Sequence, residues 1–493
     1  MSYRVYPVTK TADICRDYTV KVNGEPIALH TARVSAEPIN RRWPGHQREI
    51  AQTELVNFAL LETDGPLTFE ITPKDAFDKV EVRPRSLGIA PEIKSGVIRF
   101  TLERPAYLTV EPFGRNRALH LFVDPVAQYD ADKTSPDVLY FGAGEHDAGE
   151  IVLQSGQTLF LDEGAVVYGR VTAIGAEHIR ILGRGILDAS RNKEEILYEA
   201  NAVGNEVAVQ NARRFDTVRL DFCADVEIDG VTIRDSLLYN IRPIACAGLT
   251  IRRVKLIGNW RYNSDGIDMH NCENVRISDC FIRTFDDSIC VKGFDYHQKA
   301  VMAYAGRVYD SFKHVLVERC TIWNDWNKGL EIGAETRGRE ICDITFRNCD
   351  LIHTTYTALD CANADNAEVH DVTYEDIRVE YDEEMRQPVI QKKDGERYRN
   401  PDSDYVPPLL SVKVYHHKEY SSSGAERGKN HDFVFRDIAL FGRQRPRLVF
   451  WGYDADHRTE RVTVENLSWN GKKMTAADLS PEVGDFAGDI EIR

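Results

Sequence analysis

A short pattern of apolar and polar residues recurs through the chain from about residue 150 onward. Each copy is a triplet with apolar first and third residues and, in six of the eight copies, a polar middle residue, the period-two pattern of a β-strand; the copies lie at residues 226–228, 249–251, 275–277, 315–317, 344–346, 372–374, 433–435 and 462–464. Most triplets follow the previous one after 23 to 29 residues, and two longer steps indicate insertions. This spacing, with no helical period between the triplets, predicts a solenoid of stacked strands.

A second series of strands runs through the same repeats, at residues 266–269, 288–291, 329–332 and 358–361. Two sheets stacked coil upon coil favour a right-handed parallel β-helix, with first coils at residues 157–169 and 179–188. We therefore assign residues 149–493 to a β-helix domain. Residues 382–431 are polar and too long for a usual turn, and we interpret them as an insertion that borders the cleft or reaches another subunit.

Residues 1–148 also alternate between apolar and polar residues, but they lack the repeat seen from about residue 150 onward. Strand patterns at residues 18–22, 67–71, 80–82, 98–102 and 119–123 are separated by turns that contain Pro and Gly. A small β-sandwich is the natural prediction for such a domain. The expected fold class is therefore all-β, a right-handed parallel β-helix preceded by a small N-terminal β-sandwich domain.

Composition narrows the range of partners. The chain has 493 residues, 42% of them hydrophobic, which is enough for a large core and for two domains. A formal charge of −16, spread without a long acidic run, argues against nucleic acid and against a basic membrane-binding surface. Residues 1–6 lack the apolar core of a signal peptide, so we expect a cytoplasmic protein. A homo-oligomer is compatible with this composition.

The ten cysteines are expected to be structural. The chain contains no Cys-x-x-Cys pair, and Cys280, Cys320 and Cys349 occupy the same place in successive repeats. Other repeats hold aliphatic residues at that place: Val231, Val254, Ile377, Ile438 and Leu467. Cysteine then acts as a small hydrophobe in a buried stack, and neither a metal nor a cofactor is expected.

Three of the four acidic residues in two matching phrases are Asp265, Asp286 and Asp287; the phrases are Asn263-Ser264-Asp265-Gly266-Ile267-Asp268 and Phe285-Asp286-Asp287-Ser288-Ile289-Cys290. Residues one repeat apart stack on adjacent coils at roughly 4.8 Å, so Asp265, Asp286 and Asp287 should form one cluster. Like charges at close range raise the pKa of one member and leave the others ionised. Hydrolysis of a glycosidic bond needs that asymmetry, because one carboxyl group protonates the leaving oxygen while a carboxylate activates water.

Alignment of the second strand series extends the cluster into columns of polar residues. The inward apolar positions are Ile267, Ile289, Leu330 and Leu359. The strand starts then carry Asp265, Asp287, Lys328 and Thr357, preceded by Ser264, Asp286, Asn327 and Tyr356. Outward positions carry Asp268, Cys290, Glu331 and Asp360, followed by His270 and Lys292. A single Asp in such a place would be read as a turn residue, so the hypothesis depends on the cluster.

These phrases, together with Lys328-Gly329-Leu330-Glu331-Ile332-Gly333-Ala334-Glu335-Thr336-Arg337-Gly338, resemble the active-site phrases of the family 28 glycoside hydrolases, the polygalacturonases and their relatives. The resemblance covers roughly residues 150–380, and residues 332–335 resemble the exo-acting branch of that family. A sandwich ahead of a β-helix is also similar to the dextranase-type enzymes of family 49. The resemblance implies a pectin-lyase-like fold and an exo-acting, inverting glycoside hydrolase without a cofactor.

Roles carried over from the resemblance make Asp286 the general acid, while Asp265 and Asp287 hold and deprotonate the attacking water. Inversion follows from the resemblance alone, because a coil spacing near 5 Å is closer to the retaining range of about 5–5.5 Å. The expected partner is a carbohydrate. The expected substrate-binding residues are Asn263, Asp268, His270, Lys292, Trp326, Lys328, Glu331, Glu335, Arg337, Asp360 and Trp43.

Aromatic residues in loops are the usual partners of sugar faces. Trp260, Trp323 and Trp326 precede or follow the acidic phrases and are expected near the cleft, although Trp323 also fits simple packing after Ile322. Trp43 stands in a loop of the first domain, residues 41–48, which is rich in Arg and is predicted to close one end of the cleft.

Two departures from the family pattern bear on the substrate. Asn327-Lys328-Gly329 stands where polygalacturonases carry Gly-His-Gly, and the Arg-Ile-Lys phrase that grips a uronate carboxylate is missing near Asp360. An acidic residue there would repel a carboxylate and suits neutral hydroxyl groups. Lys292, Lys328 and Arg337 are cations that an anionic sugar can use, so both substrate classes stay open.

Two other functions compete with hydrolysis. A polysaccharide lyase on the same fold would use the acidic residues to hold Ca²⁺ beside an Arg or Lys base, and the Asp-Asp phrase after Asn-Ser-Asp favours hydrolysis over it. A non-catalytic, carbohydrate-binding β-helix is the other alternative, because a fold does not fix a function. In the cytoplasm, imported oligosaccharides are the expected substrates.

Overall fold

The computed structural model describes residues 2–10, 13–38, 50–191, 216–293, 303–304, 306–381, 389–391, 397–399, 406–418, 421 and 426–493. These residues are almost entirely in strands and turns, with one short α-helix, α3 (Ala476–Leu479), and two 3-10 turns, η1 (Ile50–Gln52) and η2 (Arg85–Leu87). Within these ranges no helix has the length and apolar character needed to cross a membrane. The predicted all-β fold is confirmed.

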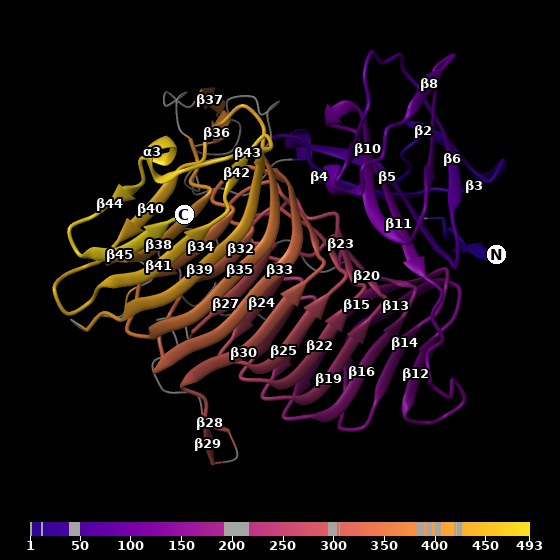
Figure 1. Cartoon of the computed structure of the whole chain (residues 1–493). Coiled ribbons are helices and arrows are strands. Elements are labelled where there is room, and N and C mark those ends of the chain that lie inside the picture. The colour runs from indigo at the N-terminus through magenta and orange to yellow at the C-terminus, as the bar shows by residue number, and fades with distance from the viewer. Residues whose placement is uncertain are drawn as a thin grey trace.

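The N-terminal domain is a β-sandwich, drawn in indigo and purple in Figure 1. Val20, Phe69 and Ile98 of one sheet are buried against Leu108 and Leu121 of the other. One sheet contains β1 (Tyr3–Val5), β4 (His30–Ser35), β5 (Thr53–Thr63), β7 (Glu81–Arg83), β10 (Ala106–Arg115) and β11 (Leu119–Pro125). The other contains β2 (Tyr18–Val22), β3 (Glu25–Ile27), β6 (Leu67–Pro73), β8 (Glu92–Lys94) and β9 (Val97–Leu102).

The second domain is a right-handed parallel β-helix whose coils build three sheets (Figure 1). The sheet that carries the repeated triplets, here the triplet sheet, contains β12 (Val138–Phe141), β14 (Thr158–Leu161), β16 (Glu177–Gly183), β19 (Ala224–Asp229), β22 (Ala247–Arg252), β25 (Glu273–Ser278), β30 (Ser311–Glu318), β33 (Glu340–Thr354), β35 (Glu368–Tyr381), β39 (Lys429–Phe441), β41 (Thr459–Glu465) and β45 (Ala487–Ile492). Val226, Leu249 and Val275 pair in register, as the triplets predict.

The second strand series forms another sheet, here the site sheet. It contains β18 (Val218–Asp221), β21 (Ile241–Ile244), β24 (Ile267–His270), β27 (Ile289–Lys292), β32 (Leu330–Ala334), β34 (Leu359–Asn363), β38 (Leu410–Val414), β40 (Leu448–Trp451) and β44 (Glu482–Val483). The predicted inward column is confirmed, because Ile267 pairs with Ile289, Ile289 with Leu330 and Leu330 with Leu359.

The third sheet faces the sandwich and contains β17 (Ile186–Asp188), β20 (Thr232–Arg234), β23 (Lys255–Ile257), β26 (Phe281–Thr284) and β31 (Thr321–Asn324). Strands β13 (Gly144–Val152) and β15 (Ala165–Ile174) bend from this sheet into the site-sheet column. Three two-stranded pairings complete the described strands: β28 (Ala303–Tyr304) with β29 (Arg307–Val308), β36 (Val389–Gln391) with β37 (Arg397–Arg399), and β42 (Ser468–Trp469) with β43 (Lys472–Lys473).

Left-handed residues mark the corners of the coils on both sides of each triplet. Asp225, Asn274 and Asp343 precede triplets with φ of 52°, 56° and 55°, and Gly230 and Asp279 follow them with φ of 84° and 56°. Asn, Asp and Gly tolerate positive φ better than other residues, so the repeated turn residues fix where each strand ends.

The ladder of the β-helix begins earlier than the boundary at residue 149 that the sequence suggested. β12 pairs with β14 and β13 pairs with β15, so Val138 already belongs to the first coil. The repeat is hard to see there because Gly and charged residues interrupt the apolar alternation of β13. The predicted loop at residues 41–48 lies outside the described residues, as does about half of residues 382–431, whose described part includes strand β38 of the β-helix.

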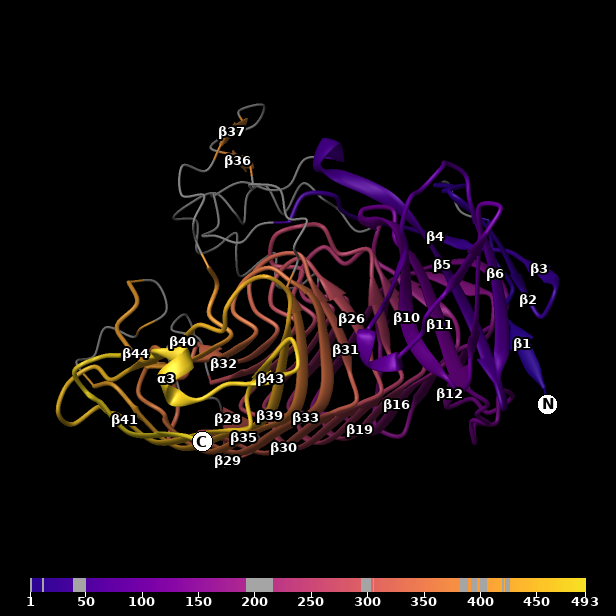
Figure 2. The same cartoon turned by 45° about the horizontal axis from the view of Figure 1, so that its top comes forward.

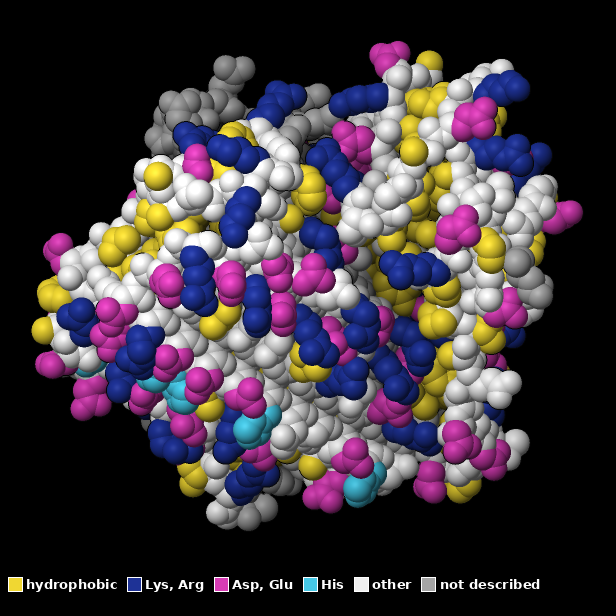
Figure 3. Space-filling model, viewed as in Figure 1, with side chains coloured by type: hydrophobic (Ala, Val, Ile, Leu, Met, Phe, Trp, Pro, Cys, Tyr) yellow, Lys and Arg dark blue, Asp and Glu magenta, His cyan; other side chains and the backbone are white. Residues whose placement is uncertain are grey.

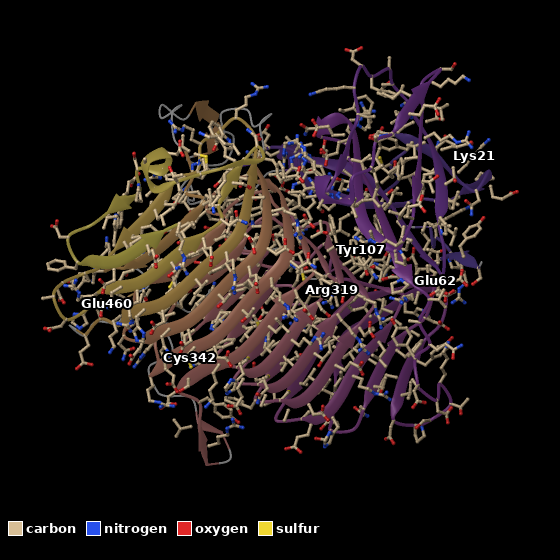
Figure 4. All side chains as sticks on the ribbon, viewed as in Figure 1. Lys21, Glu62, Tyr107, Arg319, Cys342 and Glu460 are labelled. Carbon is tan, nitrogen blue, oxygen red and sulfur yellow. The ribbon has the colours of Figure 1, made fainter. Side chains whose placement is uncertain are left out.

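The sandwich packs against the side of the β-helix through a buried apolar layer. Figure 2 shows sandwich strands β10 and β11 next to β26 and β31 of the β-helix. Phe58 and Phe122 of the sandwich share this layer with Phe281 and Trp323 of the β-helix. Tyr107, labelled in Figure 4, lies in the same layer, and its hydroxyl group donates to the carboxylate of Asp124. Lys255 of the β-helix also binds Asp124, at 3.0 Å. The two domains therefore share a core as well as buried ion pairs.

Candidate active site

The acidic phrases lie at the starts of β24 and β27 and on the outward face of the site sheet. Backbone amides of Gly266, Ser288 and Gly329 donate to the carbonyl groups of Asp287, Lys328 and Thr357. This ladder puts Asp265, Asp287, Lys328 and Thr357 in one column, in the order read from the sequence. Asp268, Cys290, Glu331 and Asp360 pair in register as the next outward column.

Asp286 is held by three hydrogen bonds although its side chain is almost fully buried. The Asn327 side-chain amide donates to Oδ1 at 2.8 Å, the backbone amide of Asp287 donates to Oδ1 at 2.9 Å, and the backbone amide of Asn263 donates to Oδ2 at 3.2 Å. Burial, together with the neighbouring charge of Asp287, raises the pKa of Asp286 to about 7, against the effect of Asn327. Asp286 therefore keeps its proton to a much higher pH than an ordinary aspartate does.

Asp265 and Asp287 face each other across adjacent coils. One carboxylate oxygen of each and the sulfur of Cys290 lie within 4.8 Å of one another. Burial and the charge of Asp286 raise the pKa of Asp265 well above its ordinary value, although Lys292 opposes the shift. Oδ1 of Asp265 has no hydrogen-bond partner among the described residues. A bound water or substrate hydroxyl group would supply the missing donor.

Lys292 connects the cluster. Its ammonium nitrogen lies 3.1 Å from Asp268, 3.6 Å from Asp287, 3.6 Å from Glu335 and 3.7 Å from Asp265. Burial disfavours the charged amine, but the carboxylates, led by Asp268, outweigh it and raise the pKa of Lys292 well above its ordinary value. Lys292 is therefore a permanent cation that holds the carboxylates together.

Asp268 and His270 flank Lys292 on the preceding strand. Burial disfavours the Asp268 carboxylate, but Lys292 and His270 outweigh it and lower the pKa of Asp268. His270 Nδ1 lies 3.1 Å from the Gly293 carbonyl oxygen, so that nitrogen donates and Nε2 faces Asp268 at 3.2 Å. These two predicted binding residues thus orient Lys292.

A second charged group continues the outward face toward the C-terminus. Lys328 binds Glu331 and lies 3.4 Å from Asp360, while Lys413 lies 3.8 Å from Asp360 on the other side. Burial and the charge of Asp287 raise the pKa of Glu331 well above its ordinary value, although Lys328 opposes the shift. Each lysine of this group is therefore already neutralised by a carboxylate.

Comparison with known proteins shows which family the region around the acidic cluster resembles. Residues 168–396 match the family model described as "Glycosyl hydrolases family 28", and this stretch contains the whole acidic cluster. The region is therefore similar to glycoside hydrolase family 28. The predicted resemblance is thereby confirmed.

Curated relatives of the family 28 region are plant proteins. The chain is 26% identical over 225 residues to a probable polygalacturonase of Vitis vinifera, a match that covers 41% of this chain and 44% of that protein. A polygalacturonase of Gossypium barbadense is 32% identical over 116 residues, which cover 23% of this chain and 27% of that protein. The chain thus spans less than half the length of these relatives.

Solved structures share the fold over a longer stretch. Dex49A from Penicillium minioluteum matches with a TM-score of 0.67 at 15% identity, over 99% of this chain and 96% of that protein. An exopolygalacturonase from Thermotoga maritima matches with a TM-score of 0.51 at 16% identity, over 72% of this chain and 84% of that protein. The Dex49A match includes the sandwich as well as the family 28 region, which confirms the family 49-like layout.

The tryptophans of the family 28 region have different surroundings. Trp326 is 9% exposed and packs edge-on against Tyr262, beside Phe285, next to the turn that holds Asn327. Trp323 lies in the domain interface instead of the cleft, because its indole donates to Asp325 at 2.7 Å and its ring stacks beside His353. Trp260 is buried and donates to Asp235 at 3.2 Å.

Of the remaining predicted binding residues, Glu335 and Arg337 lie in the described structure and Trp43 does not. Glu335 and Arg337 follow β32, and both are half-buried on the side of the site sheet next to Gly293. A Cβ atom at Gly293 would lie 2.6 Å from the Arg337 nitrogen, so only glycine lets the two coils approach so closely.

Sequence reasoning missed two side chains of this face. Lys413 and Trp451 lie in the same outward column of the site sheet as Lys292, on later coils. The register shows this, because Ala362 pairs with Lys413 and Lys413 pairs with Trp451. Lys413 lies within residues 382–431, predicted from the sequence to be an insertion, and Trp451 lies on the next coil, so the repeat spacing hides the alignment. Trp451 is 42% exposed, whereas the rest of β40 is buried, a contrast that the continuous apolar run at residues 448–451 does not show.

Proposed function

We propose that the protein is a glycoside hydrolase that removes terminal sugars from an oligosaccharide or polysaccharide with inversion. The observation that carries the proposal is the buried Asp286 carboxyl group, whose pKa is raised to about 7, beside Asp287, which is ion-paired with Lys292. A glycosidase needs such a pair, one carboxyl group to donate a proton and one carboxylate to activate water. The match to the family 28 model and the polygalacturonase relatives support the same reaction class.

In the proposed reaction Asp286 gives its proton to the glycosidic oxygen as the bond from that oxygen to the anomeric carbon breaks. A water molecule between Asp265 and Asp287 attacks the anomeric carbon from the opposite face and loses its proton to this pair of carboxylates. The raised pKa of Asp265 makes it a stronger base than an ordinary aspartate when it is ionised. The product then has the inverted anomeric configuration.

Burial of the cluster supports action on chain ends. Asp265, Asp286 and Asp287 are 2%, 4% and 6% exposed, which suits a pocket for one terminal sugar better than an open groove for the middle of a polymer. An exo-acting enzyme releases short products from the first turnovers onward. Chromatography of early products distinguishes this from the mixture of lengths that internal cleavage gives.

The ion pairs favour an uncharged sugar beside Asp360. Lys328 and Lys413 are each within 4 Å of Asp360, and within the part of the chain that the structure describes neither oxygen of Asp360 accepts a hydrogen bond. Sugar hydroxyl groups can donate hydrogen bonds to these Asp360 oxygens, whereas a uronate carboxylate would be repelled by the negative charge of Asp360. The curated relatives are polygalacturonases, so galacturonan oligomers belong in the assay beside neutral oligosaccharides.

The lyase alternative fits the site less well. A lyase needs a neutral lysine or an arginine as its base, and the carboxylates around Lys292 and Lys328 raise the pKa of both amines. Products without the absorbance of an unsaturated sugar would support hydrolysis. A non-catalytic binding module would bind sugars but release none.

The test compares the protein with its Asp286→Asn variant on neutral and uronic oligosaccharides, with the product anomer read by NMR. Asp225→Asn is the matched control, because Asp225 is an exposed corner residue of the triplet sheet. We expect the control to keep full activity and Asp286→Asn to lose at least about 100-fold in kcat, the lower end of the range for a general acid. Equal turnover by both variants would remove Asp286 as the acid.

A further inference from the structure

A second cluster of ligand-type side chains lies on the triplet sheet, a different sheet of the β-helix from the one that carries the candidate active site. Cys342, labelled in Figure 4, projects from β33 on the outer face of this sheet. Figure 3 shows that acidic, basic and histidine side chains crowd this face of the molecule. Glu340, Cys342 and His370 each offer one ligand atom here, and the three atoms lie within 4.8 Å of one another.

The register of the sheet brings these residues together. Cys342 pairs directly with His370 on the next coil, and Glu340 lies two residues before Cys342, so all three side chains share one face. His370 Nε2 and Glu340 Oε2 are 4.0 Å apart. Ligand atoms around a tetrahedral zinc ion are about 3.5 Å apart, given bonds of about 2.0–2.3 Å. A small rotation of the three side chains would therefore close the site.

His370 is oriented so that one nitrogen faces the other two ligands. Its Nδ1 donates to the Asp371 carboxylate at 2.7 Å, which leaves the Nε2 lone pair directed toward Glu340. This is the arrangement in which a carboxylate fixes the ring of a metal-bound histidine. The ring of His431 stacks on His370 at 5.0 Å and 9° and limits its rotation. His431 itself contacts Asp432 and Glu368 through its two nitrogens, at 2.6 and 2.7 Å.

Cys342 differs from the buried cysteine stacks. Cys280, Cys320 and Cys349 are at most 1% exposed and face the apolar core, whereas Cys342 is half-buried and points outward beside Glu340. We propose that Glu340, Cys342 and His370 form a binding site for a zinc-type divalent transition metal. A sulfur, an imidazole nitrogen and a carboxylate oxygen suit zinc, and a water molecule would complete the coordination.

The proposed ion links two adjacent coils of the triplet sheet. It takes no part in the chemistry of the acidic cluster on the site sheet. Because the ligands come together only in the folded chain, the ion stabilises the fold by an amount that grows with its free concentration. Hydrolysis of a sugar requires none of these three residues. The role of the site is therefore structural, and it does not depend on the proposed glycosidase activity.

The test titrates the chelator-treated full chain with Zn²⁺ by calorimetry and with Co²⁺ by absorption. We expect one equivalent to bind, a thiolate-to-cobalt charge-transfer band to appear and the Tm to rise with added Zn²⁺. The variants Cys342→Ser and His370→Ala should lose the band and the Tm shift. Asp371→Asn should weaken binding by roughly tenfold, as is typical when the partner of a ligating histidine is removed.

Matched controls keep the test decisive. Cys15→Ser changes another cysteine that is not fully buried, and His314→Ala removes an exposed histidine of β30, the coil before the site, that binds Asp343 of β33. Both controls should bind as the unmodified chain does. Absence of binding to the folded unmodified chain would overturn the proposal, as would equal binding after Cys342→Ser and His370→Ala. Glu340→Gln provides a third ligand variant if either of these fails to fold.

Discussion

The side-chain amide of Asn327 donates a 2.8 Å hydrogen bond to Oδ1 of Asp286. Asn327 has a φ of 68°, in the left-handed region that asparagine tolerates, so the turn before β32 aims its amide at the preceding coil. A donor on a carboxylate favours the ionised form, and Asn327 accordingly lowers the pKa of Asp286 against the larger effect of burial. Asn327 thereby sets how high the pKa of the candidate acid rises.

Replacement of Asn327 by Ala should move the alkaline limb of the activity profile to higher pH. Activity requires protonated Asp286, so it should fall as pH rises through the pKa of about 7. Loss of a hydrogen bond to a charged group, worth about 1.5–3 kcal/mol, should raise that pKa by about one unit or more. The measurement is kcat/KM against pH for both proteins on the best substrate of the panel. A limb that stays in place or moves down would contradict this role.

The same pKa predicts a change of stability with pH. The pKa of Asp286 is raised in the folded state, so its favourable contribution is complete below the unfolded pKa of about 3.9 and is lost as pH rises through about 7. Asp286→Asn removes the cost of ionising a buried carboxyl group. At pH 8 we expect the free energy of unfolding in urea to be higher for the variant than for the parent, by up to about 4 kcal/mol. At pH 4 the two free energies should differ little.

Asp225→Asn again serves as the control, because Asp225 is exposed and should show no such dependence. An Asp286→Asn effect of equal size at both pH values would indicate a packing change instead of the loss of an ionisable group.

Lys292 should be indispensable to the carboxylate cluster. It lies within 4 Å of four carboxylates, so Lys292→Met leaves buried negative charges without a partner. Removal of one partner of a buried ion pair typically costs about 3–5 kcal/mol. We expect that loss in urea unfolding at pH 7, and a smaller loss at pH 4, where the carboxylates can take up protons. Lys21→Met on the exposed sandwich strand β2 should change neither value by more than about 0.5 kcal/mol.

The fold was predictable because its signals are local and repeated. The triplets and the second strand series each follow period two, and their spacing fixes which residues stack, so Asp265 and Asp287 could be aligned from the sequence alone. The corner residues reinforce the pattern, since Asp, Asn and Gly recur where the backbone needs positive φ.

The contacts between the domains were not predictable, because they join residues far apart in sequence. Arg115 of the sandwich binds Asp325, which also accepts from the indole of Trp323 and lies two residues before Asn327. Nothing near Arg115 or Asp325 signals a pairing across 210 residues. The sandwich thus braces the turn that positions Asn327. Likewise, Cys342 resembles the stacked cysteines in sequence, and only the register with His370 distinguishes it.

Trp451 should matter for long substrates and not for short ones. It lies in the outward column of Lys292, four coils away, at roughly 19 Å for a strand spacing of about 4.8 Å, which is the length of several sugar residues. Its ring is 42% exposed and rests against Gly484, where a Cβ atom would lie 3.0 Å from the indole. An exposed indole on the face of the candidate site suits stacking on a sugar ring.

Trp451→Ala should therefore lower kcat/KM for oligosaccharides long enough to reach it by roughly tenfold, about 1.4 kcal/mol, and leave disaccharides unaffected. Steady-state kinetics on a series of increasing chain length provides the measurement. Tyr453→Ala is the matched control, because Tyr453 is 43% exposed on the same end of the β-helix but follows β40 outside the outward column. An equal loss at every chain length would show that Trp451 supports the fold of the last coils, since a binding contact four coils from Lys292 can act only on substrates that span the distance.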